Sequence, residues 1–314
     1  MCSAPGAEHR QWGKSSEERP PCPYAPSRWQ GIYYEETGAG TPILFIHEFG
    51  GDHRSWDDQV RHFGRSWRCI TWGARGYPPS DCPQDEKLYG QDFFNRDAIA
   101  VLDAAGVDKA HVVGLSMGGY TALMLAAKFP ERVISCTAAG ARLGRGQGHA
   151  RPVPRGRACA RAAEFERAGK HRRRGRRRSA RRACSCRTRI RSAGAPSWRT
   201  WPSIRRTPPP RRCATVQAGR ASLYDLEAEL KGIKAPVLLL VGDEDEPCLD
   251  VNLWMKRLMP NARLGFLPGS GHAINLEEPA LFNQLIEQFI ADVERGSWRP
   301  RDPRAVGSDA AWRR

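Results

Sequence analysis

Two blocks of this sequence, residues 29–140 and 221–297, alternate short apolar runs with stretches of helical periodicity. Residues 42–46 form a continuous apolar run, which is typical of a strand buried on both faces. Residues 92–105 instead place apolar side chains at helical spacing and end at Gly106. Because strands that alternate with helices build a mostly parallel sheet covered on both faces, the pattern predicts an α/β fold.

The same reasoning predicts the other elements of the two blocks. We expect further strands at 32–36, 68–72, 111–113, 133–138, 236–241 and 262–267. We expect further helices at 55–63, 119–128, 223–230, 249–258 and 279–293.

An Arg-rich segment, residues 141–220, separates the blocks and follows neither period. It holds 24 arginines and one lysine against two acids, so it carries a charge of +23 in a chain whose formal net charge is +16. The rest of the chain is therefore mildly acidic. Between residues 170 and 194 the only large aliphatic side chain is Ile190. Such a composition buries too little apolar surface to offset about 1–2 kcal/mol of ordering entropy per residue, so we expect disorder.

Three interpretations of the Arg-rich segment stay open. Its arginines suit a nucleic-acid-binding insert that contacts phosphates, although nucleic acid is the least favoured partner. The segment also fits a flexible tether. The interpretation we favour is translation in the wrong reading frame, because Arg, Ala, Pro, Gly, Ser and Cys dominate, as they do when GC-rich DNA is read out of frame. The return of ordered patterning near Leu223 fits a compensating second shift.

The chain thus divides into five parts. They are a disordered N-terminal tail (1–28), the first part of the core (29–140), the Arg-rich insert (141–220), the second part of the core (221–297) and a C-terminal tail (298–314).

Neither the cysteines nor the apolar runs indicate a metal, a membrane or export. The ten cysteines contain no C-x-x-C pair at zinc-ligand spacing. The first 30 residues lack an apolar run of signal-peptide length, and no stretch approaches the ~18 apolar residues of a membrane span. We expect a cytoplasmic protein without a metal or cofactor. The sequence contains no signal of oligomeric state.

The motif Gly114-Leu115-Ser116-Met117-Gly118 fits the pattern G-x-S-x-G, between an apolar strand and a helix of small residues. Bulky side chains at either glycine would collide with the neighbouring strand and helix. The turn would expose the Ser116 hydroxyl at a helix N-terminus, whose dipole favours developing negative charge. Ser116 is therefore the candidate nucleophile, and a plain strand-to-helix turn is the alternative.

A serine nucleophile needs a base, and the base needs an acid that orients it. His272, in a Gly-rich loop after a predicted strand, is the only one of eight histidines in a suitable setting. The alternative is a structural histidine. Three acids follow the preceding strand, and we choose Asp245 because the loop must leave the strand before it reaches His272. Asp243 is the runner-up, and Glu244 should point elsewhere.

Serine catalysis also needs N–H donors for an oxyanion, each worth about 2.7–4 kcal/mol. We expect one donor to be the backbone N–H of Met117, directly after the nucleophile. The other should come from the loop His47-Glu48-Phe49-Gly50-Gly51, with Phe49 as the donor.

Together these motifs resemble the α/β-hydrolase-fold serine hydrolases. The most similar group contains enol-lactonases, C–C bond hydrolases, carboxylesterases and cofactor-free haloperoxidases. The resemblance covers residues 29–140 and 221–297 and rests on segments 43–52, 75–80, 114–119, 242–245 and 271–272.

The resemblance implies hydrolysis of a small-molecule ester or lactone through an acyl-enzyme on Ser116. The alternatives are C–C bond hydrolysis on the same fold, and a catalytically weak or idle scaffold with a nucleic-acid-binding insert.

Two features depart from the family. His-Gly is usual where this chain has His47-Glu48, and we expect Glu48 to point to solvent or to pair with Arg75. The family also has a mostly helical cap where this chain has the Arg-rich segment. Because the cap excludes water and positions substrate, its loss implies weak, unselective activity on small activated esters.

Overall fold

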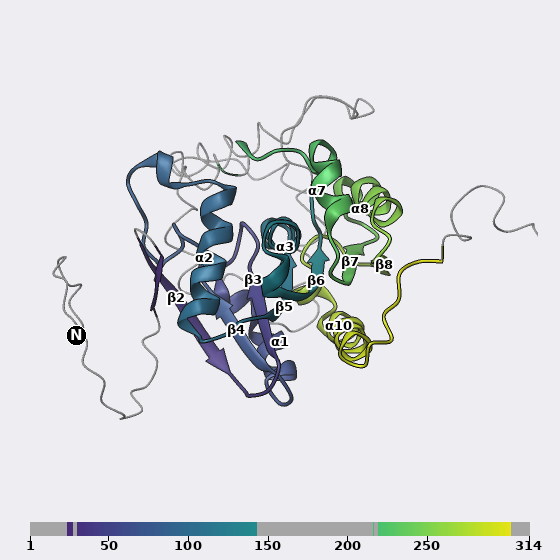
Figure 1. Cartoon of the computed structure of the whole chain (residues 1–314), viewed down its shortest axis with the longest axis horizontal. Helices are drawn as coiled ribbons and strands as arrows, with labels where there is room; N and C mark the ends of the chain where they lie inside the picture. The colour runs from purple at the N-terminus through teal and green to yellow at the C-terminus, as the bar shows by residue number, and fades with distance from the viewer. Residues whose placement is uncertain (1–23, 28–29, 143–215, 217–218, 303–314) are drawn as a thin grey trace, which may run out of the picture.

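The computed structural model of the chain describes residues 24–27, 30–142, 216 and 219–302 (Figure 1). At its centre is an eight-stranded sheet in the order β1-β2-β4-β3-β5-β6-β7-β8. The strands are β1 (Tyr24–Ser27), β2 (Gln30–Thr37), β3 (Pro42–Ile46), β4 (Arg68–Trp72), β5 (Ala110–Leu115), β6 (Val133–Ala139), β7 (Val237–Gly242) and β8 (Ala262–Leu267).

The α-helices are α1 (Asp57–Phe63), α2 (Gln91–Ala104), α3 (Met117–Lys128), α7 (Glu227–Gly232), α8 (Glu246–Leu258), α9 (Ile274–Glu277) and α10 (Pro279–Glu294). Helices α1, α2, α3, α7 and α8 lie between strands that are consecutive in the chain, and α9 and α10 follow β8. Short 3-10 helices are η1 (His53–Trp56), η2 (Glu86–Leu88), η3 (Pro130–Arg132) and η4 (Leu223–Leu226).

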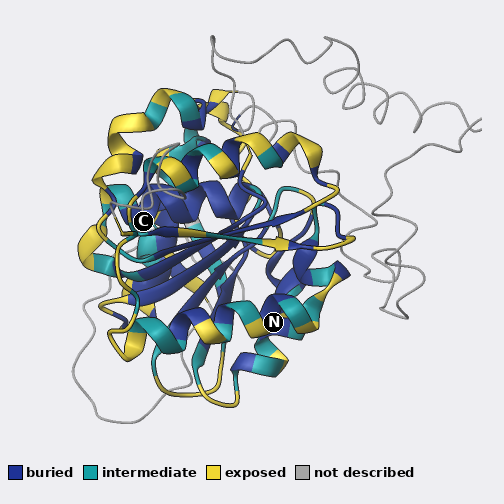
Figure 2. Ribbon diagram, turned by 90° about the vertical axis from the view of Figure 1, so that its right-hand side faces the viewer, coloured by how far each residue is buried: buried dark blue, intermediate teal, exposed yellow. Residues whose placement is uncertain are grey.

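The sheet confirms the predicted fold class. β1 and β2 are antiparallel to their neighbours, and the strands from β4 across to β8 pair in parallel. Helices α2, α3, α7 and α8 cover one face, and α1 and α10 cover the other (Figure 1). Seen along its edge, the sheet is a buried layer between two helical layers (Figure 2).

The central strands are apolar on both sides because each face of the sheet has its own core. Leu44 and Val112 belong to the apolar cluster under α2 and α3. Their sequence neighbours Phe45 and Val113 belong to the cluster under α1 and α10. Successive side chains of a strand point to opposite faces, so a strand covered on both faces needs a continuous apolar run.

Two helices begin earlier than the periodicity predicts. α3 begins at Met117 rather than at residue 119, directly after the candidate nucleophile. α8 begins at Glu246 rather than at residue 249, with Pro247 in its first turn. Proline is tolerated there because the first N–H groups of a helix have no intrahelical acceptor. Both shifts bring a candidate catalytic residue directly onto a helix N-terminus.

Three boundaries of the predicted tails and insert are wrong. Tyr24–Ser27, assigned to the disordered tail 1–28, is strand β1, and its Ala25 is buried. Trp298, assigned to the C-terminal tail 298–314, packs edge-on against Phe289 with ring centroids 4.5 Å apart. Arg220, assigned to the disordered insert, is buried with its guanidinium 4.3 Å from the Tyr120 ring centroid. These contacts are tertiary, so local composition did not reveal them.

The other expectations for these segments fall on residues 1–23, 28–29, 143–215, 217–218 and 303–314, outside the described residues. They include the disordered insert, its nucleic-acid interpretation and the absent cap. Within the described ranges, no helix combines the length and apolarity needed to cross a membrane.

Candidate active site

Ser116 occupies a strained turn between β5 and α3. Its φ is +56°, and it is the only non-glycine residue at positive φ in the described part of the chain. The flanking glycines leave no room for a side chain. A Cβ on Gly114 would overlap the backbone of Gly118, and a Cβ on Gly118 would overlap the carbonyl of Ile46. The turn therefore requires glycine at both positions, as the motif predicts.

Ser116, His272 and Asp245 form a continuous line of hydrogen bonds across the ends of β5, β7 and β8. The Ser116 Oγ lies 2.8 Å from Nε2 of His272. On the other side of the ring, Nδ1 lies 2.6 Å from Oδ2 of Asp245. Since a carboxylate only accepts hydrogen bonds, Nδ1 donates to Asp245 and Nε2 is free to accept from the serine hydroxyl.

Asp245, rather than its neighbours, contacts the histidine. Burial alone would raise the pKa of its carboxyl, but the hydrogen bond and charge interaction with His272 hold that pKa below its usual value. Asp243 is exposed and accepts from the Ser270 N–H at 3.2 Å. Glu244 is also exposed. The runner-up therefore holds the loop before His272 and does not reach the imidazole.

Glu277, which the sequence analysis did not single out, holds the His272 loop from both sides. Its carboxylate accepts from the Gly271 N–H at 2.8 Å and from the Ala273 N–H at 3.0 Å. Both bonds flank the histidine, so they fix the position of its backbone. The only sequence signal was an acid five residues after His272, which is too common a pattern to be noticed.

The Tyr77 side chain contacts both residues expected to supply the oxyanion donors, Met117 and Phe49. Met117 is the first residue of α3, so its N–H has no intrahelical acceptor. The Tyr77 hydroxyl donates to the Phe49 carbonyl at 3.0 Å and lies 4.0 Å from the Met117 Sδ. Tyr77 therefore links the loop after β3 to the N-terminus of α3, and it is a second residue whose role the sequence did not reveal.

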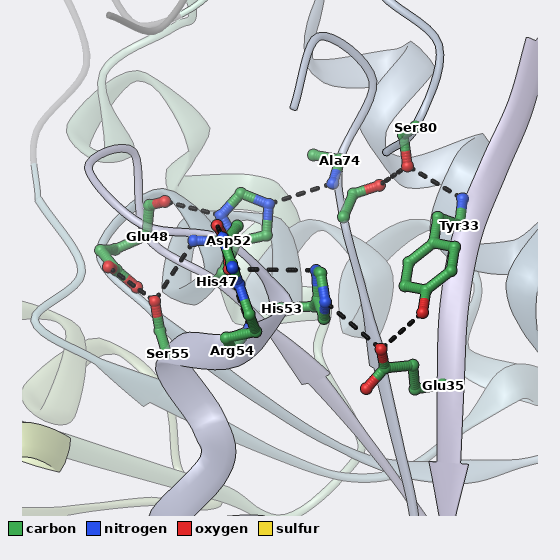
Figure 3. A network of polar contacts seen from close by, with 11 residues as sticks. Tyr33, Glu35, His47, Glu48, Asp52, His53, Arg54, Ser55, Ala74 and Ser80 are labelled. Atoms are coloured by element: carbon green, nitrogen blue, oxygen red, sulfur yellow. Dashed lines mark hydrogen bonds and ion pairs between the residues drawn. The ribbon is translucent and has the colours of Figure 1, made fainter. Parts of the chain in front are cut away.

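His47 anchors the loop after β3 without facing the serine. Burial lowers the pKa of its imidazole to about 4, so the ring is neutral near pH 7. Its Nε2 accepts from the Ala74 N–H at 3.0 Å, and its Nδ1 donates to the Glu48 carbonyl at 2.7 Å (Figure 3). The ring thus ties this loop to the loop after β4.

The position of Glu48 differs from both expectations, because its side chain neither points to solvent nor pairs with Arg75. Its side chain turns inward toward Ser55, whose hydroxyl donates to Oε1 at 3.0 Å (Figure 3). The other oxygen, Oε2, is buried and has no partner among the described residues. Arg75 is not available to pair with it, because Arg75 forms a buried ion pair with Asp97. The carboxyl fills the space beside Gly51, where a Cβ would overlap it.

The inward position shifts the protonation equilibrium of Glu48. Burial raises the pKa of its carboxyl, and hydrogen bonds from its own backbone N–H and from the Ser55 hydroxyl oppose that rise only in part. Glu48 therefore favours its protonated, neutral form more than an exposed glutamate does. At a given pH the Glu48 carboxyl therefore carries less negative charge than an exposed glutamate does, which weakens its repulsion of any negative charge formed beside this loop.

Cys248, in the first turn of α8, also borders the site. Its Sγ lies 3.9 Å from Nδ1 of His272 and 3.6 Å from the carbonyl oxygen of Gly140. Gly140 in turn packs against the imidazole, which a Cβ at that position would meet at 3.4 Å. The cysteine spacing predicted no metal site, because spacing along the chain does not show which cysteines approach a histidine.

Comparison with known proteins gives one result for the family and several for relatives. The family model described as the alpha/beta hydrolase fold matches residues 41–279. A 2-hydroxy-6-oxo-6-phenylhexa-2,4-dienoate hydrolase of Comamonas testosteroni is 28% identical over 82% of this chain and 91% of its own length. A 3-oxoadipate enol-lactonase of Acinetobacter baylyi is 36% identical over 31% of this chain and 35% of its own length. The structure of Est816, an N-acyl homoserine lactone degrading enzyme, superposes with a TM-score of 0.65 at 26% identity and covers 85% of this chain and all of that one.

Proposed function

Because the chain belongs to the α/β-hydrolase fold family, we propose that it hydrolyses a small carboxylic ester or lactone through an acyl-enzyme intermediate on Ser116. Two of its relatives are a dienoate hydrolase and an enol-lactonase. The observation that carries the proposal is the unbroken hydrogen-bonded line from the Ser116 hydroxyl through His272 to Asp245.

In the first half of the reaction the Ser116 Oγ attacks the carbonyl carbon while Nε2 of His272 takes the hydroxyl proton. The resulting oxyanion accepts hydrogen bonds from the N–H groups of Met117 and Phe49. The tetrahedral intermediate then collapses, and the imidazolium returns its proton to the departing alkoxide. The lowered pKa of Asp245 keeps that carboxyl ionised, so it stabilises the imidazolium throughout.

In the second half a water molecule attacks the acyl carbon while Nε2 removes its proton. Collapse of this second intermediate releases the carboxylic acid and returns the proton to Ser116. The ester bond is cleaved with the uptake of one water, and the enzyme ends in its starting state.

The test is a burst experiment with p-nitrophenyl acetate. Wild-type protein should release a stoichiometric burst of p-nitrophenol, and Ser116→Ala should abolish it and lower turnover by about 10³-fold or more. Ser66→Ala is the matched control, because Ser66 is an exposed serine at the opposite ends of the strands. Unchanged turnover in Ser116→Ala would refute the proposal.

A catalytically idle scaffold is the competing interpretation, and a fluorophosphonate probe separates the two. The proposal requires covalent labelling of wild type and of the Ser66→Ala control, with no labelling of Ser116→Ala. Absence of labelling in folded wild-type protein would favour a scaffold over an enzyme.

C–C bond hydrolysis is the second candidate function, favoured by the similarity to the dienoate hydrolase of Comamonas testosteroni. The same residues would serve both reactions. A panel that pairs aryl esters and lactones with 2-hydroxy-6-oxo-dienoates decides between them. A higher kcat/KM on the dienoates would reverse our order of preference.

A further inference from the structure

Cys248 has no part in the proposed hydrolysis, although its thiol is buried beside the two residues that activate the serine. One ligand atom from each of Asp245, Cys248 and His272 lies within 4.8 Å of the other two. Nowhere else in the described ranges do three His, Cys or carboxylate side chains converge in this way. The cluster escaped the sequence analysis because its members span 27 residues and fit no Cys/His spacing motif.

We propose that Asp245, Cys248 and His272 form a binding site for a thiophilic divalent cation such as Zn²⁺, and that the bound cation inhibits the enzyme. The binding half of this proposal stands on the cluster alone. The inhibitory half rests on the proposed hydrolase function.

The donor set selects the class of cation. A thiolate, an imidazole and a carboxylate together suit Zn²⁺ and softer divalent ions, whereas Mg²⁺ and Ca²⁺ take oxygen ligands. Cys248 stands three residues after Asp245, so the two side chains leave the start of α8 on the same side. His272 approaches them from the loop after β8.

The distances are close to those a tetrahedral zinc ion requires. Zinc–ligand bonds of about 2.3 Å to sulfur and about 2.0–2.2 Å to nitrogen or oxygen separate S from N by about 3.5 Å and N from O by about 3.3 Å. In this structure the Cys248 Sγ is 3.9 Å from Nδ1 of His272, and Nδ1 is 2.6 Å from Oδ2 of Asp245. The first pair must close by about 0.4 Å and the second must open by about 0.7 Å to meet these values. The third pair, the Cys248 Sγ and a carboxylate oxygen of Asp245, lies within 4.8 Å.

The cluster has one open side. Cys248 is fully buried, but the His272 side chain is 36% exposed, so an ion enters past the imidazole. Three protein ligands leave a fourth position for water on that side, which is the arrangement of an exchangeable zinc site rather than of a closed structural one.

Charge and protons balance at the occupied site. The Asp245 carboxylate and the Cys248 thiolate together neutralise a divalent cation. Burial and the neighbouring Asp245 carboxylate raise the pKa of the Cys248 thiol, and the charges of Arg142 and Arg220 oppose that rise only in part. The cation must therefore displace the thiol proton when it binds. Binding sends the thiol proton to solvent, and the imidazole gives up its Nδ1 proton while Nε2 takes one up. One proton is released for each ion bound, and no other bond breaks.

A cation bound at this site prevents His272 from acting as the base. With Nδ1 bound to the cation, Nε2 carries the ring proton and donates to the Ser116 hydroxyl instead of accepting from it. The Asp245 carboxylate no longer orients the imidazole. The serine therefore keeps its proton, and hydrolysis resumes only when a chelator removes the ion.

Zinc binding is measured first, on the full-length chain freed of metal and titrated against a chromophoric zinc chelator. Cys82→Ala, which removes an exposed thiol outside the cluster, should bind as wild type does. Cys248→Ala should lose one site or weaken it about tenfold or more. With Co²⁺, wild type should show a thiolate-to-cobalt absorption that Cys248→Ala lacks. Equal zinc binding by Cys248→Ala and wild type would overturn the proposal.

Inhibition is measured next, with each variant compared with its own zinc-free rate. Zn²⁺ should inhibit wild type and Cys82→Ala reversibly, Mg²⁺ should not, and Cys248→Ala should need about tenfold more Zn²⁺. Ser116→Ala should still bind zinc, so failure of the hydrolase proposal is distinguishable from failure of the metal site. Zinc bound through Cys248 without loss of activity would refute the inhibitory half.

Discussion

Two loops that follow neighbouring parallel strands meet at the candidate active site. Backbone atoms limit the shape of one loop, and side-chain atoms limit the shape of the other. In the nucleophile turn, residues 114–118, the obstacles to a side chain at Gly114 or Gly118 are backbone atoms. In the Glu48 loop, residues 47–51, the obstacles at Gly51 are the Glu48 carboxyl and the Ser55 hydroxyl. Gly50 in the same loop meets nothing within 4 Å.

The two loops should differ in how well they tolerate substitution. A turn limited by backbone can be built only from glycine at the limiting positions, because no substitution elsewhere removes the obstacle. A loop limited by side chains can be altered, since its shape depends on the size and protonation of Glu48. Substitutions at the glycines of the nucleophile turn should therefore be strongly destabilising, whereas substitutions in the Glu48 loop should be tolerated once Glu48 is made smaller.

The largest expected effect is that of Gly118→Ala. Its methyl group would overlap the Ile46 carbonyl, so α3 must move away from β3 and carry Ser116 with it. We expect kcat to fall about 100-fold or more and the free energy of unfolding to fall by about 2–3 kcal/mol. Gly50→Ala is the control and should change stability by less than about 0.5 kcal/mol. Equal effects of Gly118→Ala and Gly50→Ala on kcat in steady-state assays and on the free energy of unfolding in urea would show that the two loops are equally tolerant.

A smaller effect is expected for Gly51→Ala, and a second substitution at Glu48 tests the cause of that effect. The new methyl group meets both the Glu48 carboxyl and the Ser55 hydroxyl, so we expect a loss of about 1–3 kcal/mol in the free energy of unfolding. Glu48→Gly removes the first obstacle but not the second, so the double variant should recover part of that loss, with a coupling energy of about 1 kcal/mol or more. The same second change should not rescue Gly118→Ala. Simple additivity at Gly51 would show that its obstacle is not Glu48.

The smallest effect concerns pH. Because the pKa of Glu48 is raised in the folded protein, its proton is held more tightly there than in the unfolded chain. Its contribution to stability is thus fully present below its unfolded pKa of about 4.5 and is lost as the pH rises through the folded pKa. Glu48→Gln should flatten that loss, which unfolding in urea at a series of pH values measures.

The activity of the same variant provides an independent check. Above its folded pKa, Glu48 places a negative charge beside the forming oxyanion, so wild-type kcat should decline on the alkaline side by less than about tenfold. Glu48→Gln should lack that decline. Parallel pH profiles for the two proteins would mean that Glu48 keeps one protonation state throughout.

Patterns local in the chain predicted most of the fold. The predicted bounds of β3, β4 and β8 match the structure to the residue. In β3 and β4 four successive residues are buried, as expected for strands covered on both faces, whereas β8 is an edge strand that exposes Arg263 and Phe266. Strand β1 was missed because four residues that include Pro26 show no period. Trp298 and Arg220 were misassigned because their burial depends on Phe289 and Tyr120, which are distant in sequence.

The sequence alone predicted seven of the eight strands and the turn at Ser116, because steric limits on the backbone and the periodicity of burial act between near neighbours. It also ordered the candidate residues along the strands. Contacts between distant segments decide that Asp245 rather than Asp243 meets His272, that the Glu48 carboxyl turns inward to Ser55, and that Cys248 borders the imidazole. Those outcomes depend on which side chains from separate loops share one buried space, and that space exists only after the sheet has assembled.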